Sequence, residues 1–194
     1  MKSGLKAMTT MFSKFESLGT KAMPNGTVLY GKAPHVGEQA WLHGLYPPCP
    51  EAGLATIEEE VDASLPASLR KLLLLANGLE IFSGVLSLYG WREDFKRTVE
   101  AVLSQPYSIV TPNTLERPEW LPRESWIVGS YEDLTAVCLG KGGVVAVCTP
   151  DSGDVICEWK TLNAFLQGEA KRLPGLFDET GRELDESASP LPKE

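Results

Sequence analysis

Residues 57–90 read IEEEVDASLPASLRKLLLLANGLEIFSGVLSLYG, a run that predicts two helices, a helix stop and an extended segment. Pro66 divides the helices, because proline fixes φ and lacks an N–H, so it is tolerated in a first helical turn and poorly in a helix interior. The second helix ends at Asn77-Gly78, two residues that tolerate the left-handed conformation of a helix C-terminus. Its four consecutive leucines, residues 72–75, cannot share one narrow stripe, so we expect this helix to be buried on more than one side.

Three motifs in this run, in their order and spacing, resemble the signature of the SUKH superfamily. They are Leu65-Pro66 with Leu69, Leu72 and Leu73, then Asn77-Gly78-Leu79, then Leu88-Tyr89-Gly90. A later run over residues 126–129, followed by a hairpin and a helix over residues 162–166, fits the remainder of such a domain. The resemblance extends from Leu45 to Leu173. It implies structural roles for the motif residues Pro66, Asn77, Gly78, Tyr89 and Gly90.

The apolar pattern and the resemblance predict the same α+β fold. Four runs after Ser125 are short, rich in Val, Ile and aromatic residues, and separated by turn residues, which is typical of an antiparallel meander. These runs are residues 126–128, 134–139, 144–148 and 155–159. We predict a mostly antiparallel sheet of five to six strands with helices packed on one side. A SUKH-like domain (45–176) is expected between an N-terminal extension with a short helix (1–44) and an acidic, mobile tail (177–194).

Apolar residues at three- and four-residue steps predict two further helices. The first covers residues 5–18, and we expect its apolar face to pack on the domain's own surface. The second covers residues 92–103, with Phe95, Val99 and Val102 on its apolar face. The histidines, His35 and His43, have no cysteine or carboxylate at ligand spacing, so we expect both in surface loops.

The charge of the chain argues against nucleic acid as a direct partner. The formal net charge of the 194 residues is −8, and residues 178–194 contribute −4 of it through six acidic and two basic residues. Such a chain has no excess of Lys and Arg with which to displace counterions from double-stranded nucleic acid. A basic protein partner is compatible with this charge, although acidity also serves solubility alone.

The cysteines and the hydropathy pattern predict a reduced, cytoplasmic protein. The spacing of Cys49, Cys138, Cys148 and Cys157 matches neither a CxxC motif nor a zinc site. Three of them lie in apolar, strand-like runs, where a free cysteine acts as a small buried hydrophobe. Residues 1–19 do not resemble a signal peptide, and no stretch is long and apolar enough to span a bilayer. We therefore expect no membrane association and no disulfides.

No pattern of residues supplies a catalytic set. The glycines at positions 140, 142 and 143 are followed by a strand and not by a helix, whose N–H groups would bind phosphate. There is no GxSxG nucleophile elbow, and the histidines lie far from the strand cysteines in sequence. We therefore predict a binding protein with no catalytic residue, no metal and no cofactor. A small hydrolase or nuclease assembled from distant residues is the alternative from another class.

The resemblance implies two functions. The first is a bacterial immunity protein that binds and neutralises a cognate toxin domain, because the superfamily includes many bacterial immunity proteins. A basic toxin domain, such as a nuclease, would be steered by acidic residues at the rim of the interface. The candidate contacts are charged residues near the motif: Glu58, Glu59, Glu93 and Asp94. The alternative is a non-catalytic regulatory or scaffold adaptor, like the superfamily's regulators of yeast cell-wall glucan synthesis.

Overall fold

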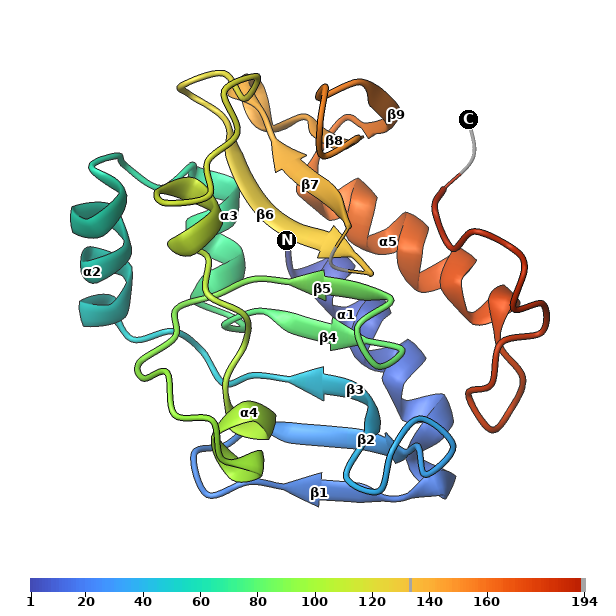
Figure 1. Cartoon of the computed structure of the whole chain (residues 1–194). Helices are drawn as coiled ribbons and strands as arrows, with labels where there is room; N and C mark the ends of the chain where they lie inside the picture. The colour runs from blue at the N-terminus through green and yellow to red at the C-terminus, as the bar shows by residue number, and fades with distance from the viewer. Residues whose placement is uncertain (133, 193–194) are drawn as a thin grey trace.

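The computed structural model describes residues 1–132 and 134–192 and has an α+β fold (Figure 1). Within these residues, nine strands form one antiparallel sheet whose spatial order follows the sequence. The α+β class and the antiparallel pairing are confirmed, whereas the prediction of five to six strands was too low. The strands are β1 (Thr20–Ala22), β2 (Val28–Lys32), β3 (Trp41–Leu45), β4 (Leu79–Ile81), β5 (Leu86–Leu88), β6 (Trp126–Tyr131), β7 (Thr135–Leu139), β8 (Val145–Cys148) and β9 (Val155–Trp159).

Two of the unpredicted strands, β1 and β3, flank β2 in a segment rich in glycine and proline. Gly31 and Gly44 lie inside β2 and β3, where glycine weakens the strand signal of a sequence. All three residues of β1 are exposed, so β1 shows no alternation of apolar and polar residues. Pairing with β4 extends the sheet into this segment, through His43 opposite Ile81. The additional strands therefore depend on tertiary pairing, which local propensity does not report.

A tight turn divides the run after Gly78 into two strands. Phe82, Ser83 and Gly84 all have positive φ between β4 and β5. The backbone N–H of Phe82 donates to Nδ1 of His43 (3.2 Å), and Oγ of Ser83 donates to the carbonyl of Trp41 (3.0 Å). Positive φ is uncommon for residues other than glycine, so these bonds from β3 stabilise the turn.

Five α-helices lie in the described part of the chain. Of these, α1 and α5 run together behind the sheet (Figure 1), and the N–H of Gly4 in α1 donates to Oδ1 of Asn163 in α5 (2.9 Å). Buried side chains of α1, α2, α3 and α5 belong to one apolar core with the sheet. The helices are α1 (Lys2–Phe12), α2 (Glu51–Val61), α3 (Ala67–Leu73), α4 (Val99–Ser104) and α5 (Leu162–Arg172), with 3-10 turns η1 (Ser13–Leu18), η2 (Thr111–Asn113), η3 (Lys141–Gly143) and η4 (Leu173–Leu176).

The two faces of the sheet carry side chains of different size. The inner face, toward α1 and α5, carries large apolar residues, such as the neighbours Leu79 and Leu88. On the opposite, outer face, register-paired residues form a row across strands β2 to β8, and most of them are small or polar. The row runs through Leu29, Gly44, Glu80, Ser87, Ser130, Ala136 and Cys148. The main core thus lies on the face toward α1 and α5, and a shallower surface is left on the other.

A loop covers the outer face over β6 to β8. Asn113 in this loop donates to the carbonyl of Ile127 (2.7 Å) and accepts from its N–H (2.9 Å), which extends the pairing of β6. Arg117 donates to the carbonyl of Pro122 (2.7 Å) and closes the loop on itself. Beneath it lies a small apolar cluster of Leu121, Ile127, Cys138 and Cys148. The outer face over β2 to β4 lies outside this cover.

The helix predicted over residues 92–103 was wrong in extent and in orientation. Only Val99–Ser104 is helical, because the carboxylate of Asp94 accepts from the N–H of Lys96 (3.0 Å) and forms a turn before it. Phe95, Val99 and Val102 are more than half exposed, so they do not face the core. Residues of α4 line the outer face beside Leu29 and Glu80, and α4 is therefore the exception to the prediction that the helices pack on one side.

His43 is buried in β3, which contradicts its predicted place in a surface loop. Its ring is 1% exposed, stacks on Phe12 at 4.5 Å between centroids and contacts the edges of Phe15 and Phe82. Burial lowers the pKa of His43 to about 3, so the ring is neutral. The surrounding glycines and prolines conceal this strand in the sequence. His35 lies in a turn after β2, as predicted.

The predicted boundaries at residues 45 and 177 stay predictions, and the structure shows contacts across both. β3, which ends at Leu45, pairs with β4 in the same sheet. Phe177 stacks on Phe82 at 3.8 Å between ring centroids. Arg172 donates to the carbonyl of Pro190 (2.8 Å), so the described part of the tail contacts α5.

Candidate functional site

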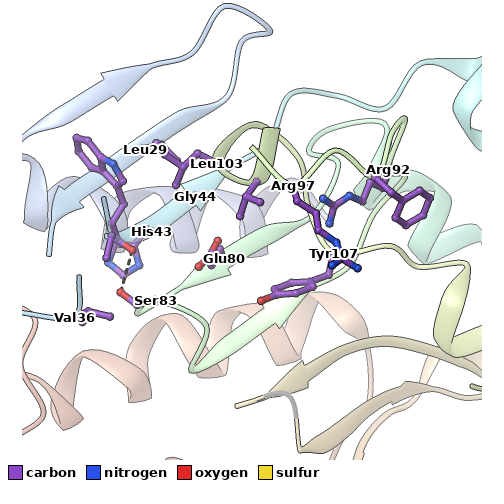
Figure 2. A pocket seen from close by; sticks show the side chains of 14 residues that line it. Leu29, Val36, His43, Gly44, Glu80, Ser83, Arg92, Arg97, Leu103 and Tyr107 are labelled. Carbon is purple, nitrogen blue, oxygen red and sulfur yellow. Dashed lines mark hydrogen bonds between the residues drawn. The ribbon is translucent and has the colours of Figure 1, made fainter. Parts of the chain in front are cut away.

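A groove of about 480 Å³ lies on the uncovered part of the outer face (Figure 2). Its floor is the register-paired row of Leu29, Gly44 and Glu80 from β2, β3 and β4. Gly44 has no side chain, and this leaves the middle of the floor open. Val36 and neighbouring residues form one wall, and residues 92–107 with α4 form the other. The groove is thus enclosed by the sheet and by two connecting segments.

The wall formed by residues 92–107 exposes large apolar side chains. Phe95 is 68% exposed, Val102 is 52% exposed and Tyr107 is 47% exposed. Val36 on the opposite wall is 57% exposed. Single exposed apolar residues are ordinary, but a group of them around one concavity marks an interaction site. Aromatic residues and arginine are also the residue types enriched at protein interfaces.

The charges of the groove are arranged along its length. In Figure 2, Arg92, Arg97 and Tyr107 lie toward one end, Glu80 lies near the middle, and Val36 lies at the other end. The hydroxyl of Tyr46 donates to Oε2 of Glu80 (3.2 Å). Burial, followed by the charge of Glu80, raises the pKa of Tyr46 well above its ordinary value, so Tyr46 is a neutral donor. The groove therefore has a cationic, aromatic end and an apolar end.

The motif residues hold the two ends of the wall. The carboxamide of Asn77 donates to the carbonyl of Trp91 and accepts from its N–H, both at 2.7 Å. At the other end, the N–H of Gly90 donates to the carbonyl of Tyr107 (3.0 Å). A side chain at Gly90 would overlap the carbonyl of Asn77, and one at Gly78, whose φ is 94°, would overlap the carbonyl of Leu88. These residues therefore fix where the segment between Trp91 and Tyr107 leaves the body and returns to it.

The other two motif residues lie beside this arrangement. Pro66 is the N-cap residue of α3, where the missing N–H of proline costs no hydrogen bond within the helix. Tyr89 is half-buried, and its ring contacts Tyr107 at 6.0 Å between centroids. Tyr89 therefore links the motif to a residue that lines the groove.

The four acids predicted as partner contacts do not form one site. Glu59 is exposed on α2, whereas the carboxylate of Glu58 accepts from the N–H of Leu65 (2.8 Å) and links α2 to the start of α3. Glu93 is exposed at the base of the groove wall. Asp94 bonds Lys96 and Gln105, and the Lys96 N–H is the main reason why its pKa is lowered. Glu59 and Glu93 are thus available to a partner, and the other two are engaged within the fold.

Two features that some enzymes use, a metal-binding group and an activated Cys49, are not found among the described residues. Within residues 1–132 and 134–192, no three His, Cys, Asp or Glu side chains are grouped so that they could hold a metal ion. Burial raises the pKa of Cys49 to about 11, which disfavours the thiolate that nucleophilic chemistry requires. The described helices include none of the length and hydropathy needed to cross a membrane. The groove has the chemistry of a binding surface.

The residues that give the groove its character escaped the sequence prediction. Phe95 and Val102 are predicted on the apolar face of a helix, where they would be buried. One signal was present, because Asp94 and Pro106 bound this segment and Asp is a frequent turn former. The segment follows directly on the motif that ends at Gly90. A surface segment that is positioned by a rigid part of the fold is a candidate for a binding site.

Comparison with known proteins gives the family. A search of curated proteins finds no match. The sequence profile of the SMI1/KNR4 family, also called SUKH-1, matches residues 48–168, which are more than half of the chain. The matched region contains α2, α3, the motif residues and the groove wall between Trp91 and Tyr107. It agrees with the resemblance found in the motifs, and the chain therefore belongs to the SMI1/KNR4 family.

Proposed function

We propose that this protein is a bacterial immunity protein that binds a cognate toxin domain in the cytoplasm and neutralises it. Family membership supports interaction with another protein in general. The observation that carries the proposal is the group of exposed apolar side chains and arginines around the groove, because such a surface is stabilised when a partner covers it.

Neutralisation requires no chemistry from this chain. Phe95 and Val102 supply apolar area, Tyr107 an aromatic ring with a polar end, and the surrounding polar residues exclude water from the contact. A toxin domain held in this way is inactive when the contact covers its own active site. The net charge of −8 attracts a basic toxin domain, such as a nuclease, over a longer range. Glu59 and Glu93 are the available contributors to this steering.

Quantitative affinity capture tests the proposal. The tagged full-length protein, a groove variant (Phe95→Ser with Val102→Ser) and a matched control (Leu115→Ser) are incubated with lysate of the source organism. Leu115 is 93% exposed and lies outside the groove, so its substitution removes an exposed apolar side chain without changing the site. Bound proteins are identified by mass spectrometry, and each candidate toxin domain is then expressed with and without this protein.

The immunity function predicts capture of a domain of a secreted protein, growth arrest when that domain is expressed alone, and growth when both proteins are expressed. The groove variant should retain much less of the domain than Leu115→Ser does. A captured cell-wall or signalling protein that is harmless alone would contradict neutralisation and favour the adaptor function. A toxin bound equally by both variants would place the interface outside the groove.

A further inference from the structure

We infer that the groove binds an extended segment of the partner in which a large apolar side chain lies close to a carboxylate. Arg97 receives the carboxylate, and the end of the groove beside Leu29 and Val36 receives the apolar side chain. The inference rests on the proposed function, because the segment belongs to the protein that is neutralised. An acidic contact segment is compatible with a basic toxin domain. The net charge of the domain governs attraction over a longer range, whereas Arg97 contacts one segment of it.

The charges inside the groove leave one cation for a ligand. The carboxylate of Glu80 accepts a hydrogen bond from the hydroxyl of Tyr46. Arg92 is also fixed within its own wall, because its Nε donates to the carbonyl of Asp94 (2.9 Å) and its guanidinium lies over Phe95 at 5.4 Å from the ring centroid. Glu80 and Arg92 are therefore both engaged within the fold.

Arg97, unlike Arg92, is not held by the fold. It is exposed, lines the groove and forms no hydrogen bond or ion pair with the residues that the structure describes. The neighbouring cation, Lys96, is paired with Asp94 at 3.1 Å. Arginine presents a planar fork of donors that matches a carboxylate. The free charge of the groove is thus positive in a protein whose net charge is −8, and an acidic segment meets attraction here and repulsion from the acidic surface in general.

The shape of the site favours an extended ligand. The floor is a row across three adjacent strands, and the cationic and apolar ends lie on opposite sides of Glu80 (Figure 2). An extended chain spaces successive side chains by about 3.3 Å and turns them alternately to opposite sides. Such a chain can place an apolar side chain and a carboxylate at the two ends of one groove.

The acidic tail of this chain borders the apolar end of the groove, because Val36 and Ser83 line the groove and also a neighbouring hollow with tail residues 181–186. The carbonyl of Gly181 lies 3.2 Å from Nε2 of His35, and Arg172 binds the carbonyl of Pro190. A side chain at Gly181 would collide with Leu42, so the tail lies directly on the body at that position. None of the described tail residues lines the groove itself, so we assign the ligand to the partner and not to the tail.

Selection from random peptides displayed on phage tests the inference. The target is the immobilised full-length protein, and the same selection is made on Arg97→Glu. Arg123→Glu is the matched control, because Arg123 is exposed and lies outside the lining of the groove. Enriched peptides are synthesised in two forms, one with the acidic residue and one with its amide. Their dissociation constants are measured by fluorescence anisotropy with wild type, Arg97→Glu, Arg97→Lys and Arg123→Glu.

The expected peptides combine an aromatic or large aliphatic residue with a nearby Asp or Glu. We expect roughly tenfold weaker binding for the amide form and for Arg97→Glu, little change for Arg123→Glu and partial retention for Arg97→Lys. The absence of enriched peptides, enrichment without an acid, or equal binding to Arg97→Glu would each overturn the inference.

The two proposals fail in different ways. A captured toxin domain that binds Arg97→Glu as tightly as wild type would refute the acidic ligand and leave the immunity function intact. Acidic peptides that depend on Arg97, together with a captured partner that is not toxic, would support the ligand and refute neutralisation. Thermal unfolding of each variant checks that an exposed substitution has not changed the fold.

Discussion

Asn77 binds the backbone of Trp91 through both ends of its carboxamide, at 2.7 Å in each case. The carboxamide thereby pairs with the backbone of Trp91, the first residue of the groove wall, as the backbone of a neighbouring strand would. Asn77 is 8% exposed, so water cannot replace these bonds when the side chain is removed. The family motif is thus connected to the groove, because it sets where the wall begins.

Asn77→Ala should lower the free energy of unfolding by about 2–4 kcal/mol, because the N–H and the carbonyl of Trp91 both lose their partner. Chemical denaturation measures this loss. Asn77→Asp keeps the acceptor and loses the donor, so it should lie between wild type and alanine. Hydrogen exchange of residues 91–107 should quicken more than exchange of β6 to β8. Equal stability of all three proteins would show that this contact does not hold the wall.

Gly90→Ala should destabilise the protein by about 1–3 kcal/mol, because the added methyl group overlaps the carbonyl and the carboxamide oxygen of Asn77. Gly175→Ala is the matched control, since an added methyl group there meets nothing within 4 Å. It should leave the midpoint of denaturation unchanged or slightly raised. If Gly90→Ala behaved like this control, the close approach of the motif strands would be of no energetic consequence.

The sequence predicts the second half of the sheet well and the first half poorly. Residues of β7 and β8, such as Val137 and Val147, alternate with smaller residues on the outer face, and this period of two is visible in the sequence. In β3 the corresponding positions are Trp41, His43 and Leu45, with Gly44 between the last two. Such a strand has no clear pattern, and it is stabilised by pairing with β4 from a distant part of the chain.

The groove could not be predicted from the sequence, because it depends on whether the apolar side chains of residues 92–107 face the core or the solvent. Phe95, Val99 and Val102 have the spacing of a buried helical stripe, and periodicity cannot distinguish a core from a partner surface. Asp94 decides the outcome by forming a turn, which shortens the helix to Val99–Ser104. The motif, in contrast, depends on local conformation, and Gly78 takes the positive φ that its position in the sequence suggests.

Acid should weaken the fold through His43. Burial lowers the pKa of this ring to about 3 in the folded protein, while the unfolded chain keeps the ordinary value of 6.5. Below 6.5 the unfolded state binds a proton that the folded state does not, so stability is fully present above pH 6.5 and declines as the pH falls toward 3. Between pH 7 and pH 5 this group should account for a loss of about 2 kcal/mol.

Comparison of pH profiles isolates this effect. His43→Phe retains a ring against Phe12 and removes the titrating group, although the N–H of Phe82 loses its acceptor. The variant is expected to be less stable at pH 7 and to lose less stability than wild type between pH 7 and pH 5. Urea denaturation at each pH gives both curves. Parallel curves would mean that other groups cause the acid sensitivity.

Charge reversals at the exposed acids and at Arg97 should both weaken binding of a basic partner with an acidic contact segment, but through different rate constants. Glu59→Lys and Glu93→Lys should slow association with the captured domain by roughly two- to fivefold at low salt, and the difference should shrink as salt screens it. Glu16→Lys, an exposed reversal at η1, serves as the control. Arg97→Glu should instead raise the dissociation rate, because it removes a contact within the complex.

Glu58 and Asp94 are unsuitable for that experiment, although both were predicted contacts. Glu58 holds the N–H of Leu65, and Asp94 holds Lys96 and Gln105, so their reversal would change the fold and the charge together. Stopped-flow kinetics with Glu59 and Glu93 variants avoids this ambiguity. Association rates that are insensitive to both reversals and to salt would argue against acidic steering.

The ion pair of Glu169 and Arg172 should tie the tail to α5. Glu169 is 1% exposed, Arg172 donates to both of its carboxylate oxygens, and the same guanidinium binds the carbonyl of Pro190. Arg172→Leu leaves a buried carboxylate without its cation and should cost about 3–5 kcal/mol, whereas the double variant Glu169→Leu with Arg172→Leu should recover much of this loss. Both variants lose the bond to Pro190, so limited proteolysis should cleave residues 178–192 faster in each. Slow cleavage in the double variant would show that other contacts, such as the stacking of Phe177 on Phe82, suffice to hold the tail.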